Sequence, residues 1–181
     1  MTVRFLAAVA LGLFLLSSMP LQASPARQGC TEAQVSLLLD VRDSHEEDRP
    51  VFSGMLGYYL LDWMQIGAKV TYESVEADSA WGYGAVWGLG GFAEAEWRRW
   101  KCMVTPYVCA ALQFLSENES GTVTVISASP GLKFFFTETI GLSAQANFEF
   151  ATRQIYKYDP ATDTADKTDV SASVALRFLF F

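Results

Sequence analysis

The chain has 181 residues, of which 51% are hydrophobic, and its formal net charge is −7. This length suits one domain with a core of its own, so stability requires neither a second domain nor a cofactor. The acidic balance, with a pI near 4.7, argues against nucleic acid as a partner, because phosphate binding needs clustered Lys and Arg.

The first 23 residues have the order of a secretory signal peptide. Arg4 supplies a positive start, residues 5–16 are apolar, and a small-residue ending closes at Ala23. The apolar run is shorter than the ~20 residues that span a bilayer, and Pro20 interrupts its continuation, which favours cleavage over a retained anchor. We therefore expect residues 1–23 to be removed from the mature protein.

From Ala33 onward, short segments alternate between apolar and polar residues, which is the period of β-strands rather than of helices. No later stretch approaches ~18 consecutive apolar residues, so no transmembrane helix is expected. The clearest segment has an apolar residue at every second position from Ile140 to Phe150. Eight strands are predicted, over residues 34–42, 52–60, 66–73, 81–96, 103–115, 122–136, 140–150 and 170–180.

The connections between these segments alternate in kind along the chain. Polar, acidic connections follow the first, third, fifth and seventh segments, and the last of them is long, over residues 154–168. Tight connections follow the other three. Long loops at one end and short turns at the other are typical of transmembrane barrels, in which the short turns and both termini are periplasmic. The sequence therefore predicts an all-β fold, an eight-stranded antiparallel up-and-down transmembrane β-barrel over residues 33–181, preceded by a short periplasmic segment, residues 24–32.

The polar face and the aromatic residues indicate which side of each strand faces outward. The polar face is rich in Gly, Ala and Ser and carries one or two charges per strand, far fewer than a water-exposed exterior. Aromatic residues gather near strand ends, as in the interfacial belts of membrane proteins. We therefore expect apolar side chains to face lipid and the sparse charges to pair inside a narrow lumen. The predicted lumen charges are Asp40, Arg42, Lys69, Glu73, Glu94, Lys133, Glu149 and Arg177.

Residues 33–181 resemble the small outer-membrane β-barrels of the OmpA, OmpX and OmpW type. The likeness rests on the eight-segment layout and on three motifs, Pro106-Tyr107-Val108, Pro130-Gly131-Leu132-Lys133-Phe134 and Arg177-Phe178-Leu179-Phe180-Phe181. In that family the barrel-assembly machinery reads a C-terminal aromatic residue, so the resemblance implies this role for Phe181. The chain departs from the family pattern in one respect. In the family, every second residue counted back from the last one is apolar. Here Arg177 interrupts the series counted back from Phe181, and the apolar series counts back from Phe180 instead.

The resemblance and the acidic loops lead to a first expectation for function. We expect a monomeric, non-enzymatic protein of the bacterial outer membrane, in contact with outer-membrane lipid and with its outer loops at the cell surface. A structural, adhesion or surface-interaction role follows, with a host or surface ligand bound through the loops.

Two alternatives remain open. His45 is the only histidine and lies in the first outer connection, and Asp78 and Ser79 lie in the second. An outer-membrane lipid A acyltransferase family also has a small barrel, with a His in one outer loop and an Asp-Ser pair in another, so these three residues resemble a catalytic set. That family begins with a long amphipathic helix, which residues 24–32 are too short to form. The other alternative is a narrow channel, although a barrel of ~8 strands is just wide enough for side chains to fill.

The three cysteines and the candidate ligand motifs add little chemistry. Cys30 and Cys102 both fall at the predicted periplasmic end, so a disulfide between them is open, whereas Cys109 is expected to face the lumen as a buried thiol. The glycines between Gly82 and Gly91 lack the spacing of a phosphate loop and are expected to relieve crowding. The aspartates after residue 158 lack the spacing of an EF-hand. No cofactor or metal site is predicted.

Overall fold

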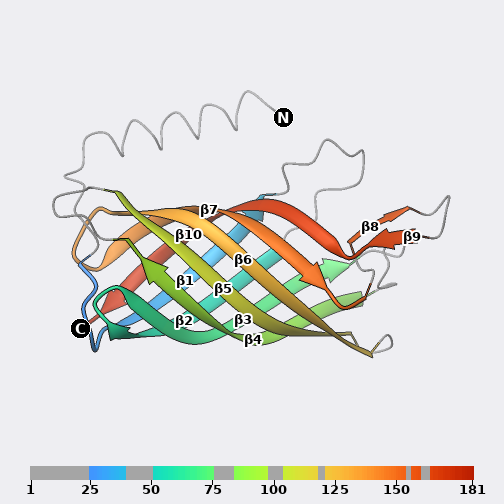
Figure 1. Cartoon of the computed structure of the whole chain (residues 1–181), viewed down its shortest axis with the longest axis horizontal. Helices are drawn as coiled ribbons and strands as arrows, with labels where there is room; N and C mark the ends of the chain where they lie inside the picture. Colours follow the sequence, from blue (N-terminus) through green and yellow to red (C-terminus); the bar gives the residue numbers. More distant parts are fainter. Residues whose placement is uncertain are drawn as a thin grey trace, which may run out of the picture.

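The computed structural model describes residues 25–39, 51–75, 84–97, 104–117, 121–153, 156–159 and 164–181. Eight β-strands within these ranges close into a barrel, and two more form a small sheet of their own (Figure 1). The barrel strands are β1 (Thr31–Leu39), β2 (Val51–Leu61), β3 (Met64–Val75), β4 (Gly84–Glu96), β5 (Val104–Glu117), β6 (Gly121–Phe135), β7 (Ile140–Ala151) and β10 (Thr168–Phe180).

Each barrel strand pairs with its neighbours in antiparallel fashion, in the order β1-β10-β7-β6-β5-β4-β3-β2. The barrel closes where β1 pairs with β10, and this pairing begins at Thr31 opposite Phe180. The predicted all-β, eight-stranded antiparallel barrel is therefore confirmed. β1 begins at Thr31, two residues before the predicted start of the barrel at Ala33 and three before the predicted first strand, which brings Glu32 into the barrel. Among the described residues, no helix is long and apolar enough to cross a membrane.

The two ends of the barrel differ in their connections. At one end, which we call the turn end, Asp62 and Trp63 join β2 to β3 and residues 136–139 join β6 to β7. The first residue of β1 and the last of β10 also lie there. At the opposite loop end, β7 leads into the hairpin of β8 (Tyr156–Asp159) and β9 (Thr164–Asp166), which stands far from the C-terminus in Figure 1.

The β8–β9 hairpin was not predicted, because residues 154–168 read as one polar connection. The sequence does carry two local signals for it. Tyr156 and Tyr158 favour a strand, and the Asp-Pro pair that follows is a turn signal. The acidic residues of this connection obscured the short alternation around the two tyrosines.

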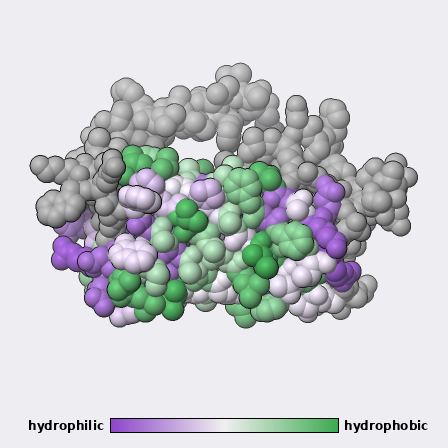
Figure 2. All heavy atoms as spheres, viewed as in Figure 1, coloured by the Kyte–Doolittle hydropathy of each residue, from purple (hydrophilic) through white to green (hydrophobic). Residues whose placement is uncertain are grey.

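The apolar side of the strands faces outward, as predicted. In β2, Met55, Gly57 and Tyr59 are buried, whereas the intervening Leu56 and Tyr58 are exposed. Figure 2 shows hydrophobic residues across the middle of the visible face and hydrophilic ones nearer its two ends. A barrel in water would reverse this distribution, because exposed apolar area of this extent is unfavourable in contact with water.

Glycine is required where neighbouring strands approach most closely. A Cβ atom on Gly90 would lie 2.0 Å from the carbonyl oxygen of Leu112, and one on Gly67 would lie 2.0 Å from that of Leu56. The expectation that glycines of β4 relieve crowding is therefore confirmed at Gly90. Such positions allow the strong curvature of a small barrel.

Three apolar layers fill the barrel at different heights. The turn-end layer consists of Ala26, Cys30, Tyr59, Phe135 and Leu179. The middle layer consists of Met55, Phe92, Tyr107, Cys109 and Ala111. The loop-end layer consists of Val86, Val123, Val125 and Ala151, with Leu115 packed against it. The sequence predicted a largely polar lumen, but the alternation of β6 turns Val123 and Val125 inward, so the loop end of the lumen contains an apolar layer beside the half-buried Glu73 and Glu149.

Candidate functional site: a charged cluster across the lumen

Buried polar side chains from all eight barrel strands meet between the turn-end layer and the middle layer. We call this group the charged cluster. Its members are Glu32 (β1), Tyr59 (β2), Gln65 (β3), Glu94 and Glu96 (β4), Tyr107 (β5), Lys133 (β6), Ser143 (β7) and Arg177 (β10). Because the strands form a ring, contacts within this group cross the lumen as well as joining neighbours.

Lys133 is fully buried and brings three carboxylates together. Its Nζ lies 2.6 Å from Glu96 Oε1 and 3.4 Å from both carboxylate oxygens of Glu32, and it also contacts Glu94. The same Nζ donates a hydrogen bond of 3.1 Å to the hydroxyl of Tyr59. The ammonium therefore has several hydrogen-bond acceptors around it, which is the condition under which a buried charge is tolerated.

Arg177 is also fully buried and links β10 to four other strands. Its Nη2 donates to Glu94 Oε2 at 3.0 Å, its Nη1 contacts Glu32, and its Nε donates to Ser143 Oγ at 2.8 Å. The guanidinium carbon lies 4.7 Å from the centre of the Tyr107 ring. Arginine suits this place because its planar group can bind carboxylates and stack on an aromatic ring at the same time.

Neutral donors complete the coordination of the carboxylates. Gln65 Nε2 lies 3.1 Å from Glu32 Oε1 and 2.5 Å from Glu94 Oε1. The Tyr59 hydroxyl lies 3.0 Å from Glu32 Oε2 and also contacts Glu96. Buried carboxylates need such partners, because an ionised group without hydrogen bonds is costly to remove from water.

A second polar network continues from the charged cluster along β6, β7 and β10. The Tyr107 hydroxyl donates to Gln145 Oε1 at 2.6 Å, and Gln145 Nε2 donates to Asn147 Oδ1 at 2.6 Å. Asn147 Oδ1 also accepts a bond of 3.0 Å from Ser129, and its Nδ2 donates to Ser173 at 3.1 Å. The middle of the lumen is thus occupied by side chains that bond to one another.

The structure brings together three of the predicted lumen charges, Glu94, Lys133 and Arg177, and all three are buried. Lys69, Glu73 and Glu149 lie on the same inward side of their strands but are only half-buried, and they lie apart from the fully buried charges of the cluster. Asp40 and Arg42 lie outside the described residues.

The sequence reasoning missed several members of the charged cluster. Glu32 had been placed in the N-terminal segment, although the alternation of β1, extended backwards, puts it on the polar face. Glu96 alternates with the apolar face of β4 just as Glu94 does. Tyr59 and Tyr107 share the inward alternation of β2 and β5, but as aromatic residues they were not counted among the polar side chains of the lumen.

Other predicted site residues are only partly covered by the described ranges. His45, Asp78, Ser79 and Cys102 lie outside them, so the acyltransferase set and the disulfide remain predictions. Cys30 is a buried free thiol in the structure, as is Cys109, which faces the lumen as expected. Phe181 follows the end of β10 and is 69% exposed, and Phe180 points outward, so the alternation does count back from Phe180. The assembly role of Phe181 remains a prediction.

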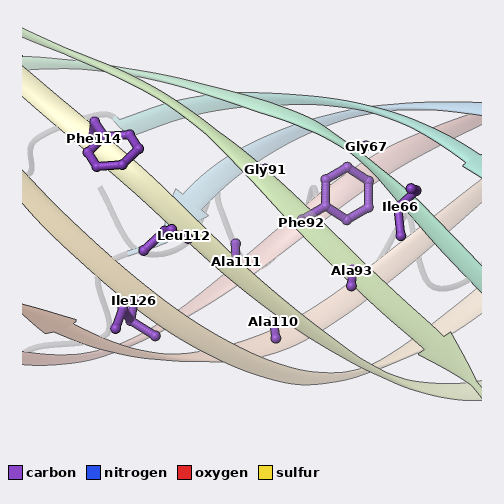
Figure 3. A pocket seen from close by; sticks show the side chains of 10 residues that line it. All are labelled: Ile66, Gly67, Gly91, Phe92, Ala93, Ala110, Ala111, Leu112, Phe114 and Ile126. Carbon is purple, nitrogen blue, oxygen red and sulfur yellow. The ribbon is translucent and has the colours of Figure 1, made fainter.

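A shallow apolar hollow lies on the outer surface, among described residues of β3, β4, β5 and β6 (Figure 3). Small outward residues, Gly91, Ala93 and Ala110, lie within it, and larger ones such as Ile66 and Phe114 line its sides. It holds no charged side chain, so it offers a lipid-like environment rather than a chemical site. The charged cluster therefore remains the feature that distinguishes the interior of this barrel.

The chain matches no protein-family model, and it matches no curated protein in sequence. Its fold does match solved structures. The N-terminal β-barrel domain of Pseudomonas aeruginosa OprF is 18% identical with a TM-score of 0.54, over 84% of this chain and 98% of that chain. Neisserial surface protein A is 15% identical with a TM-score of 0.57, over 88% of this chain and 99% of that chain.

A third match is a transmembrane β-barrel designed de novo, which is 8% identical with a TM-score of 0.55, over 85% of this chain and 98% of that chain. At these identities the matches concern the fold, and a fold carries no activity with it. The two natural barrels come from the outer membrane or surface of bacteria, and all three share the closed architecture described above. The protein therefore has the fold of the small eight-stranded outer-membrane β-barrels.

Proposed function

We propose that the protein is an integral, non-enzymatic barrel of the bacterial outer membrane, with a structural or surface-interaction role exerted through its loop end. In this role it is a monomer in contact with outer-membrane lipid, and its C-terminal strand with Phe181 is presented to the barrel-assembly machinery. A host or surface ligand would meet the acidic connections at the loop end.

The observation that carries this proposal is the inverted distribution of polarity. Large apolar side chains such as Leu89, Phe148 and Val174 are 43–63% exposed on the outer side. Lys133 and Arg177 are fully buried inside. Closed barrels satisfy every backbone hydrogen bond internally, which makes this arrangement stable in hydrocarbon and unfavourable in water.

The filled lumen supports a structural role over transport. The charged cluster and the three apolar layers occupy successive heights of the barrel, so a solute would have to displace buried ion pairs and packed side chains. The cluster also supports a non-enzymatic role. Lys133 is held among the carboxylates of Glu32, Glu94 and Glu96, an arrangement of ion pairs rather than of a nucleophile and its activating base.

Surface proteolysis on intact cells tests the location and the orientation together. The sites are the connection that contains β8 and β9 (residues 154–167) and the turn at Asp62 and Trp63. Protease added to intact cells should cut within 154–167 and leave the turn intact. After the outer membrane is permeabilised, the protease should also reach the turn. Cleavage at the turn in intact cells, with 154–167 protected, would contradict the proposed orientation.

Replacement of residues 154–167 by a Gly-Ser linker of equal length tests the role of the loop end. If the loops contact the surroundings, cells carrying this variant should adhere less to the surfaces that the unaltered protein binds, while heat-modifiable migration of the barrel stays unchanged. The matched control is a conservative change inside the barrel, Ser171→Thr.

His45→Ala and Ser79→Ala should leave lipid A acylation unchanged, and a loss of acylation would contradict the non-enzymatic assignment.

A further inference from the structure

The residues that precede β1 pack against the turn end of the barrel rather than extending away from it. We call residues 25–30 the strap. Ala26 and Cys30 are 1% and 4% exposed, whereas Arg27, Gln28 and Gly29 between them are exposed. Two small side chains therefore point into the barrel and the middle of the strap faces solvent.

A tight turn and a few hydrogen bonds hold the strap in place. The Cys30 N–H donates to the Arg27 carbonyl at 3.0 Å, and Gly29 at its centre has a φ of 91°, a conformation that suits glycine. The Gly29 N–H donates to the Tyr59 carbonyl at 2.9 Å, and the Gln28 N–H donates to Asp62 Oδ1 at 2.9 Å. Both anchors lie at the end of β2 and the turn after it, so one side of the strap is fixed to the barrel rim.

The strap lies on a layer that closes the lumen. Tyr59, Phe135 and Leu179 form this layer with Ala26 and Cys30. Tyr59 is on β2 and Phe135 is on β6, which are four strands apart in a ring of eight and therefore on opposite walls. The charged cluster lies directly beyond, because the Tyr59 hydroxyl contacts Glu32 at 3.0 Å. The strap thus separates water at the turn end from the buried ion pairs.

We propose that the strap is a lid, which opens locally to admit solvent to Cys30 and to the charged cluster while the eight barrel strands stay paired. The difference in attachment supports local opening. The strap is held by two small buried side chains and by hydrogen bonds to one short stretch of the rim, where Tyr59 N–H also donates to the Cys30 carbonyl at 2.9 Å. The barrel strands, in contrast, pair along most of their length on both sides. Segments with few buried contacts open at a lower free-energy cost than the strands of a core.

Two single-cysteine versions of the full chain report on this opening. One keeps Cys30 and carries Cys102→Ser and Cys109→Ser, and the other keeps Cys109 and carries Cys30→Ser and Cys102→Ser. A polar maleimide is reacted with each version, folded in lipid vesicles permeable to the reagent. Cys109 lies in the middle layer, beyond the charged cluster from the strap, so it reports on the barrel rather than on the lid.

Ala26→Asp places a charge in the apolar layer and should favour the open strap, because an unpaired buried charge is costly. Labelling of Cys30 is expected to accelerate by roughly tenfold or more, since local opening governs access. Labelling of Cys109 and heat-modifiable migration should not change. Arg27→Asp is the control, because it places the same side chain on the exposed side of the strap next to Ala26, and it should leave both thiols as they are.

Asp62→Ala provides a second test that leaves the interior unaltered. It removes the acceptor of the Gln28 N–H, so it should accelerate labelling of Cys30 by a smaller factor than Ala26→Asp, again without an effect on Cys109. Equal Cys30 labelling in the unaltered strap and in Asp62→Ala would overturn the proposal, even if Ala26→Asp did not fold. Simultaneous exposure of Cys30 and Cys109 would also overturn it, because the thiols would then report on unfolding of the whole barrel.

Discussion

The charged residues of the cluster are the least favourable ones to bury in this interior. Burying a carboxylate or an ammonium removes it from water, and only close, multiple contacts compensate for that loss. Lys133 and Arg177 obtain such contacts from Glu32 and Glu94, which lie on strands elsewhere in the ring. Each member therefore depends on the others, and the removal of one leaves opposite charges buried.

Lys133→Met tests this dependence. The substitution keeps an unbranched chain in the lumen but leaves the carboxylates around it without this cation, so the free energy of unfolding should fall by about 3–5 kcal/mol. The measurement is the urea midpoint of the barrel in lipid vesicles. Lys69→Met is the matched control, because Lys69 is half-buried and outside the cluster, and its loss should cost at most about 1 kcal/mol. Equal losses for the two variants would show that the cluster has no special weight.

The sequence of each barrel strand meets two requirements. Its outer side must be apolar, and it must allow the backbones of neighbouring strands to approach closely where the barrel curves. Alternation along β6 satisfies the first, because Ile126 and Leu132 point outward while Ser127 and Lys133 point inward. Gly90 satisfies the second on β4. Both requirements depend on how whole strands pair. They are therefore tested by comparing the same substitution at two positions of the paired strands.

Gly90→Ala should destabilise the pairing of β4 with β5. Its Cβ would lie 2.0 Å from a backbone oxygen of Leu112, so the strands would have to separate, at a cost of about 1–3 kcal/mol typical of overpacking. Gly91→Ala is the neighbouring control, since its Cβ would meet the Gly67 oxygen at 3.6 Å, an ordinary contact. Denaturant titration of both variants in vesicles decides between them, and equal stability of the two would contradict the close approach.

Ala110→Arg tests which medium the outer side contacts. Ala110 lies midway along β5 and is exposed (Figure 3), so an arginine there would enter the hydrocarbon and lower the free energy of unfolding in lipid by about 2–4 kcal/mol. Thr122→Arg, on the outer side of β6 near the loop end, should cost only about 0–1 kcal/mol. If the two positions tolerated arginine equally well, the middle of β5 would not face hydrocarbon.

At the scale of the whole molecule, the strands could be predicted from the sequence, whereas the side-chain contacts inside the barrel could not. The two-residue period of residues such as Ile140 to Phe150 is a local property, and alternating connections fix the up-and-down order. The meeting of Glu32 with Lys133 depends instead on how far each strand is tilted and staggered in the closed ring, across 101 positions of sequence. Charged residues could be placed in the lumen, but their partners could not be assigned.

The same limit explains the apolar layers. Val123 and Val125 lie in a segment without a clear polar face, and only the pairing of β6 with β5 turns them inward, where they close the loop end with Val86 and Ala151. The N-terminal strap was likewise beyond prediction, because Ala26 carries no pattern that marks it as buried. The position of the strap depends on the residues of the turn end against which it packs, and not on a pattern within the strap itself.

The central claim, that the outer side of every barrel strand contacts hydrocarbon while the ionic residues meet inside, is tested most directly by the behaviour of the folded chain with and without lipid. The purified chain is refolded into lipid vesicles, and the sample is compared with chain diluted into detergent-free buffer by size-exclusion chromatography and heat-modifiable migration. We expect a heat-modifiable, folded monomer in lipid and aggregation in buffer. A folded, monodisperse monomer in buffer alone would contradict the account.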